Sequence, residues 1–160
     1  MRNQSPCVLG LALAATTAVA ASAHFVRGPD AAINSTNANV TVTWKEAGLG
    51  DTVSVDYEAT AVAAARYQCV NRGGKCPAAS NKQDVLTNVS ASGSFASGKN
   101  GAINGSLTFE PPEGTLNCPG GQVLKMVSAS FTNIALSDLT NGISAGATPS
   151  SLAMSGPECP

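Results

Sequence analysis

His24 is the first residue whose chemical type could support a reaction. Export and cleavage before it would make it the N-terminal residue, and a terminal amine with an imidazole chelates copper when a second histidine completes the site. The 160-residue chain contains one histidine. On that ligand count we interpret His24 as an ordinary first residue, and we expect no metal ion and no cofactor.

A second candidate is Ser144, because residues 142–146 read G-I-S-A-G and match the G-x-S-x-G pattern of a nucleophile elbow. Such an elbow needs a strand before the serine, a helix after it and a histidine later in the chain. His24 lies upstream, and no helical pattern follows Ser144. We therefore interpret the match as a coincidence in a chain rich in small residues.

Asp56 and Glu58 are a third candidate, since two carboxyl groups can hydrolyse a glycosidic bond. They alternate with Val55 and Tyr57, the pattern of a strand with one buried and one solvated face. The acids fall on the polar set, which predicts a solvent-facing position. We therefore find no complete catalytic set and predict a protein that is not an enzyme.

The segment between Cys69 and Cys76 contains Arg72 and Lys75 in a glycine-rich turn. A disulfide that closed this turn would present a rigid basic loop, in outline like the bait loop of a protease inhibitor. Inhibition through Arg72 or Lys75 is therefore one alternative function, whereas a purely structural staple is the simpler interpretation.

The aromatic residues could instead form a platform for sugar stacking. Trp44 and Tyr57, however, belong to the apolar sets of their strands, and Tyr67 lies beside Cys69. We expect the first two in the core and Tyr67 packed near a disulfide bridge.

The amino terminus predicts export. Residues 8–21 form an unbroken run of small and apolar residues that ends in Ala21-Ser22-Ala23, a motif that signal peptidase accepts. The run is shorter than the roughly 20 residues that a membrane-spanning helix needs, and no second apolar run follows. We therefore predict a cleaved signal peptide at residues 1–23 and one secreted domain at residues 24–160, with no membrane span.

An even number of cysteines in an exported chain indicates disulfides. After cleavage four cysteines remain: Cys69, Cys76, Cys118 and Cys159. Three pairings are possible, and the short spacing favours Cys69–Cys76 together with Cys118–Cys159.

The elements that carry these residues are predicted to be strands. Apolar and polar residues alternate over residues 40–45, 53–59, 89–95, 103–109 and 127–131, with a predicted bulge near residues 132–133. Asn100-Gly101 and Asn141-Gly142 predict hairpins, and the stretch near residue 150 is expected to be a loose tail unless Cys159 is bridged. Residues 59–65 fit a strand or a helix.

About seven short strands predict an all-β fold, an antiparallel β-sandwich of immunoglobulin-like shape stapled by disulfides. A small β-barrel is the alternative.

Composition excludes several partners. Charged residues make up 12% of the chain and the net charge is −1, so no basic surface exists for nucleic acid or an anionic membrane. Hydroxyl and amide groups must therefore solvate the surface. Four sequons would accept N-glycans in a eukaryotic host, at Asn34, Asn39, Asn88 and Asn104.

Several segments resemble a group of small secreted proteins from actinobacteria and filamentous fungi. They read WKEAGLGD at residues 44–51, YQCVNRGGKCP at 67–77, NKQ at 81–83, FASGKNG at 95–101 and LNCP at 116–119. The group has no assigned activity, so the resemblance implies no catalytic residue. Its pattern does not include Cys159, which leaves a bridge from Cys118 to Cys69 or Cys76 as the alternative pairing.

Together these features predict a secreted, non-catalytic protein that binds an extracellular partner, either a cell-wall or matrix polysaccharide or a protein. The alternatives are the protease inhibitor described above, and an enzyme that uses copper at His24 or the carboxyl groups of Asp56 and Glu58.

Overall fold

The computed structural model describes residues 22–77, 81–156 and 159, so residues 1–21 of the predicted signal peptide lie outside it. The described part of the chain contains no helix long and apolar enough to cross a membrane. Its elements are eight strands: β1 (His24–Ile33), β2 (Val40–Ala47), β3 (Ser54–Asn71), β4 (Lys82–Ala96), β5 (Ile103–Phe109), β6 (Gln122–Asp138), β7 (Ile143–Gly146) and β8 (Leu152–Ser155).

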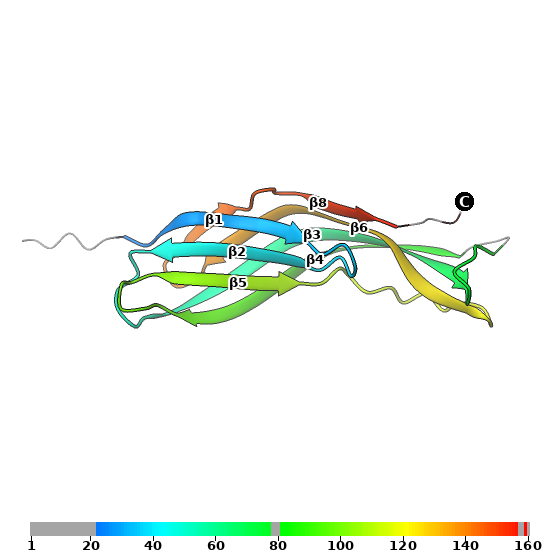
Figure 1. Cartoon of the computed structure of the whole chain (residues 1–160), viewed down its shortest axis with the longest axis horizontal. Helices are drawn as coiled ribbons and strands as arrows, with labels where there is room; N and C mark the ends of the chain where they lie inside the picture. The colour runs from blue at the N-terminus through cyan, green and yellow to red at the C-terminus, as the bar shows by residue number, and fades with distance from the viewer. Residues whose placement is uncertain (1–21, 78–80, 157–158, 160) are drawn as a thin grey trace, which may run out of the picture.

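The strands form two antiparallel sheets that pack against each other, which confirms the predicted sandwich (Figure 1). The smaller sheet has the order β1-β2-β5. The larger has the order β4-β3-β6-β7, and β8 also pairs with β6. The arrangement is consistent with an immunoglobulin-like shape. Two strands are not among those predicted from the sequence: β1, whose pairing with β2 shifts register twice, and the four-residue β8.

β3 settles the ambiguity over residues 59–65, which form a strand. The alanines at positions 59, 61, 63 and 65 are buried, and the residues between them are half-buried. The core beside these alanines is occupied by larger side chains of other strands, among them Phe131 of β6 and Phe109 of β5, whose rings lie 5.7 Å apart. β3 is therefore the central strand of the molecule, paired with β4 on one side and β6 on the other.

Trp44 and Tyr57 are buried in the core, which confirms the inward positions expected for them. The Trp44 ring lies 4.7 Å from that of Tyr57 and 5.2 Å from that of Phe95. The indole lies over Gly105 on the neighbouring β5, where any Cβ atom would collide with it.

The predicted hairpin at Asn100-Gly101 is wrong as a strand pairing. The residues do form a turn, in which the amide of Gly101 donates to the carbonyl of Gly98 (2.8 Å). However, β4 and β5 belong to different sheets, so the turn crosses from one sheet to the other. The hairpin at Asn141-Gly142 is confirmed between β6 and β7. The expected bulge is also confirmed: the β3–β6 register shifts next to Asn133, whose φ is 54°.

The four cysteines in the described part of the chain are all bridged, but the preferred pairing is wrong: the bridges are Cys69–Cys118 and Cys76–Cys159. Cys69 is fully buried near the end of β3, whereas Cys76 is exposed beyond the turn. The two cysteines therefore lie in different surroundings and bond to different partners. The first bridge is one of the two that the family resemblance left open for Cys118.

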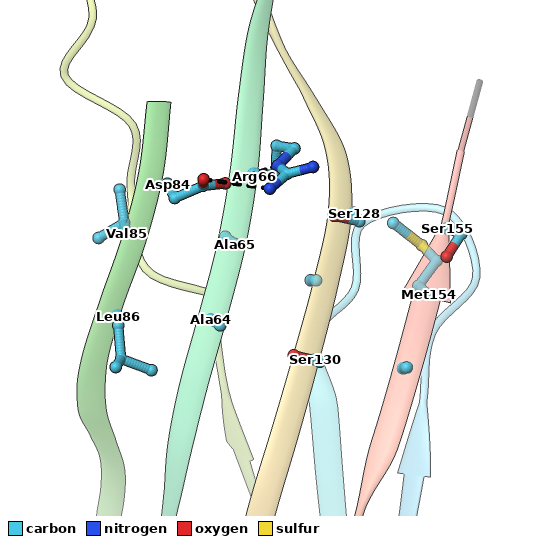
Figure 2. Close-up of a pocket in the computed structure, with 12 residues that line it drawn as sticks. Ala64, Ala65, Arg66, Asp84, Val85, Leu86, Ser128, Ser130, Met154 and Ser155 are labelled. Atoms are coloured by element: carbon cyan, nitrogen blue, oxygen red, sulfur yellow. Dashed lines mark hydrogen bonds and ion pairs between the residues drawn. The ribbon is translucent and has the colours of Figure 1, made fainter. Parts of the chain in front are cut away.

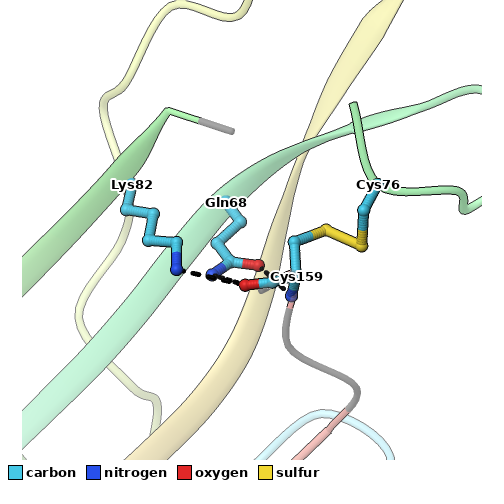
Figure 3. The surroundings of a disulfide bond; sticks show 4 residues. All are labelled: Gln68, Cys76, Lys82 and Cys159. Atoms are coloured by element: carbon cyan, nitrogen blue, oxygen red, sulfur yellow. Dashed lines mark hydrogen bonds between the residues drawn. A yellow bond between two sulfur atoms is a disulfide. The ribbon is translucent and has the colours of Figure 1, made fainter. Parts of the chain in front are cut away.

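The second bridge anchors the end of the chain (Figure 3). The amide of Cys159 donates to Oε1 of the buried Gln68 (2.8 Å), and Nζ of Lys82 donates to the Cys159 carbonyl (3.1 Å). Since Cys159 is bridged and β8 pairs with β6, the stretch near residue 150 is not a loose tail.

Candidate functional site

A cluster of buried polar side chains lies at one end of the sandwich. Glu46 continues the inward-facing series on β2, two residues after Trp44, and is fully buried. Tyr57 reaches the same point from β3, and Asp138 reaches it from the last position of β6. Glu46 and Asp138 were not predicted from the sequence, although extending the alternation of β2 by one step places Glu46 on the inward face.

Hydrogen bonds join the cluster only in part. The Tyr57 hydroxyl donates to Oε2 of Glu46 (2.7 Å). Asp138 accepts from the backbone amides of Thr140 and Asn141 (both 2.8 Å), which closes the turn into β7. Oε1 of Glu46 and Nε1 of Trp44 are buried without a hydrogen-bond partner.

Burial raises the pKa of Glu46 from 4.5 to about 7, because a buried carboxylate loses its hydration. The Tyr57 hydroxyl opposes this rise in pKa, Asp138 reinforces it, and His24 lowers it slightly. Burial, with the adjacent Glu46, also raises the pKa of Tyr57. The cluster can therefore hold a proton near neutral pH, but its carboxyl groups are sealed from solvent and cannot meet a substrate.

The two acids singled out from the sequence lie elsewhere. Asp56 is exposed and Glu58 half-buried on the outer face of β3, as the alternation predicts. Asp56 accepts a hydrogen bond from the hydroxyl of Ser94. The two carboxyl groups point the same way from one strand, whereas the acids of a glycosidase flank the bond that they break.

Ser144 and His24 are also far from any catalytic arrangement. Ser144 lies within the short strand β7 and shares a hydrogen bond with the Ser137 hydroxyl (2.8 Å), so no strand–turn–helix elbow forms. His24 is exposed at the start of β1, with its Nδ1 bonded to the Ser22 carbonyl (2.8 Å). Among residues 22–77, 81–156 and 159, no three His, Cys, Asp or Glu side chains are grouped to hold a metal ion.

The basic turn lacks the closed geometry of an inhibitor loop. Arg72 and Lys75 are exposed, and the turn is held by a hydrogen bond from the amide of Asn71 to the carbonyl of Lys75 (2.9 Å). Cys69 and Cys76 bond to other partners, so no disulfide closes the turn on itself. The disulfide-closed loop on which the inhibitor hypothesis rests is therefore not formed.

A surface site instead follows the outer face of the larger sheet. Three open cavities succeed one another along the β3–β4 pair, with volumes of about 390, 420 and 500 Å³. We call them together the outer-face trough. Its first part is lined by Asp56, Ser92, Ser94 and Leu139, its second by Glu58, Thr60, Asn88, Ser90 and Asn133, and its third by Ala64, Arg66, Leu86, Ser128, Ser130 and Ala153.

The third and largest part shows how the hollow arises (Figure 2). Ala64 and Ser130 stand side by side on β3 and β6, and their short side chains leave space above the sheet. Leu86, with 73% of its surface exposed, forms one side. At the end of the part, Arg66 and Asp84 form a two-pronged ion pair with contacts of 2.6 and 3.1 Å, which lowers the pKa of Asp84.

The trough is therefore long, shallow and mostly uncharged. From Asp56 to Arg66 it follows eleven residues of β3, and the ten steps between them span roughly 33 Å at the usual rise of a strand. Hydroxyl, amide and small apolar groups line its middle. Such a surface can form many hydrogen bonds with an extended ligand, and it offers apolar patches for the flat faces of that ligand.

Tyr67 and the sequon asparagines complete the set of predicted residues. Tyr67 is half-buried, packs over Gly114, and donates to the carbonyl of Pro112 (2.7 Å). The sequon asparagines at positions 34, 88 and 104 are exposed and Asn39 is half-buried. Asn88 lies in the trough itself.

No protein-family model matches the chain, and neither a curated protein nor a solved structure matches it. The resemblance to small actinobacterial and fungal secreted proteins therefore stays a prediction.

Proposed function

We propose that this protein is a secreted, non-catalytic binding protein whose outer-face trough holds one chain of an extracellular polysaccharide. The observation that carries the proposal is the line of three cavities along a single face of the larger sheet. A linear polymer matches a trough of this length better than a small molecule does, because a small molecule would contact only one of its parts.

The chemistry of the lining supports a neutral polymer. Ser90, Ser130 and Asn88 offer donors and acceptors, as sugar hydroxyl groups require. The carboxyl groups of Asp56 and Glu58 at one end would repel an acidic polymer. Export is supported by the two disulfides, which persist in oxidising compartments.

The proposal is tested by co-sedimentation of the oxidised protein with insoluble chitin, cellulose, β-glucan and isolated cell walls. We expect retention on one polymer, competition by its soluble oligomer, and little change when salt is raised, because the trough is mostly uncharged. A protein that stays in the supernatant with every polymer contradicts the proposal and makes a protein partner the better hypothesis.

Two variants and one control locate the site. Ala64→Arg and Ser130→Arg fill the hollow from β3 and β6, and we expect each to weaken retention at least about tenfold, which corresponds to about 1.4 kcal/mol. Thr43→Arg places the same side chain on the exposed face of the smaller sheet and should bind like the wild type. Equal loss in all three variants would show that the trough is not the binding site.

A further inference from the structure

The outer edge of β4 is the longest strand edge that the described part of the chain leaves without a partner strand. β4 has fifteen residues and pairs only with β3. The pairing runs from Ser54–Ala96 to Gln68–Lys82 without a register shift, whereas the β1–β2 and β3–β6 pairings are interrupted by bulges. Its outer edge is therefore a regular row of backbone donors and acceptors.

This edge lacks the features by which proteins protect exposed strands. Proteins shorten edge strands, bulge them, or place charges and proline on them. Residues 85–96 contain no charged residue and no proline, and the charges of β4, Lys82 and Asp84, stand at one end. The opposite margin of the sheet ends in β7 and β8, which have four residues each.

The side chains of β4 are also poorly covered. None of its fifteen residues is buried, although β3 beside it is buried along its inner face. Val85 and Val89 are only half-buried, and Leu86 is the most exposed large apolar side chain of the described residues. A partner strand beside β4 would cover these groups as well as the backbone.

We infer that β4 is a dimerisation edge, which pairs antiparallel with β4 of a second copy of this chain. A two-fold axis near the middle of residues 85–96 sets the two edges antiparallel, so that the backbone amides of each copy face the backbone carbonyl groups of the other. It also places Lys82 and Asp84 of the two copies at opposite ends of the shared ladder, so no like charges meet. In this contact each copy uses its own β4 edge, so neither copy keeps a free β4 edge for a third. The assembly is therefore a closed dimer.

The proposal does not depend on polysaccharide binding. It is tested by analytical ultracentrifugation of the oxidised protein over a range of concentrations, with hydrogen exchange of the β4 amides measured in parallel. In a monomer the alternate amides that point away from β3 exchange quickly. We expect a concentration-dependent dimer in which those alternate amides become protected.

Thr87→Lys is the matched variant, because Thr87 is exposed, lies within the uncharged stretch and lines no part of the trough. We expect its dimer to dissociate at least about tenfold more readily, while Thr43→Lys on β2 dimerises like the wild type. A protein that is monomeric at every concentration overturns the inference. So does a dimer that Thr87→Lys leaves unchanged and whose β4 amides stay unprotected.

Discussion

Glu46→Gln tests whether the buried cluster between the two sheets titrates near neutral pH. Glutamine has nearly the shape of glutamic acid, and its oxygen can still accept the hydrogen bond from Tyr57. It carries no charge at any pH. The substitution therefore removes the titration and leaves the packing of Trp44 and Tyr57 in place.

The size of the effect follows from the pKa of Glu46, which is 4.5 when unfolded and about 7 when folded. Between these values the folded protein binds the proton more tightly than the unfolded chain does, so the free energy of unfolding falls as the pH rises. Each unit of difference in pKa corresponds to about 1.36 kcal/mol, so the free energy of unfolding falls by about 3 kcal/mol in all. This fall is complete above roughly pH 7. Below about pH 4.5 Glu46 is protonated in both the folded and the unfolded state, so it no longer makes the free energy of unfolding depend on pH.

The assay is urea unfolding at pH 5, 6, 7 and 8 with the disulfides intact. We expect the wild type to lose stability across this range and Glu46→Gln to lose much less. At pH 5 the two proteins should differ little. At pH 8 the variant should be more stable by up to about 3 kcal/mol, or roughly 6–12 °C in Tm.

Glu58→Gln is the control, because it removes a carboxyl group from the outer face of β3 rather than from the interior. It should keep the pH profile of the wild type. If Glu46→Gln retains the full slope of the wild type, then Glu46 does not bind the proton in this range and the reasoning is refuted.

Three further changes test other parts of the fold by urea unfolding. Gly105→Ala places a methyl group against the Trp44 indole and should lower the free energy of unfolding by about 1–3 kcal/mol, seen as unfolding at a lower urea concentration. Removing the bridge by the double change Cys76→Ala and Cys159→Ala opens a loop with a sequence separation of 83 and should cost about 2–4 kcal/mol; faster proteolysis near the C-terminus should accompany it. Asn133→Val should cost about 1–2 kcal/mol because the residue has a φ of 54°, whereas Asn133→Gly should be nearly neutral.

Strands that lie between a core and solvent were predictable from the sequence. The alternation of β5 covers the whole strand, and that of β2 covers it from residue 40 to residue 45, two residues short of the observed end. β1 was not predictable, because Gly28-Pro29 and two register shifts break its alternation. β8 is four residues long and is held by its pairing with β6 and by the Cys159 bridge, both of which are long-range contacts.

Long-range relations explain the two wrong predictions. Asn100-Gly101 predicts a tight turn, but only the packing of the sheets decides whether the flanking strands pair or cross between sheets. Likewise, the short spacing of Cys69 and Cys76 favours a local bridge. The direction of β3 instead buries Cys69 beside the loop that carries Cys118.

The candidate sites divide in the same way. Glu46 could have been found, since it occupies the next inward position after Trp44 on a strand whose alternation is clear. The trough could not, because Ala64, Ser130 and Ala153 are unremarkable in sequence and come together only through the pairing of β3, β6 and β8.

The abundance of small side chains explains both faces of β3. On the inner face, the alanines at residues 59–65 leave room for larger core side chains from other strands, among them Phe131 of β6 beside Ala63 and Phe109 of β5, whose rings lie 5.7 Å apart. On the outer face, Ala64 and its neighbour Ser130 leave the space that forms the trough. The middle of the trough presents no aromatic or arginine side chain, the residue types that usually anchor an interface, so in the proposed binding mode the contacts are spread along the strand. Shortening one side chain would therefore remove little affinity. A bulky insertion would exclude the proposed ligand, which is why arginine rather than alanine is the informative substitution at Ser130.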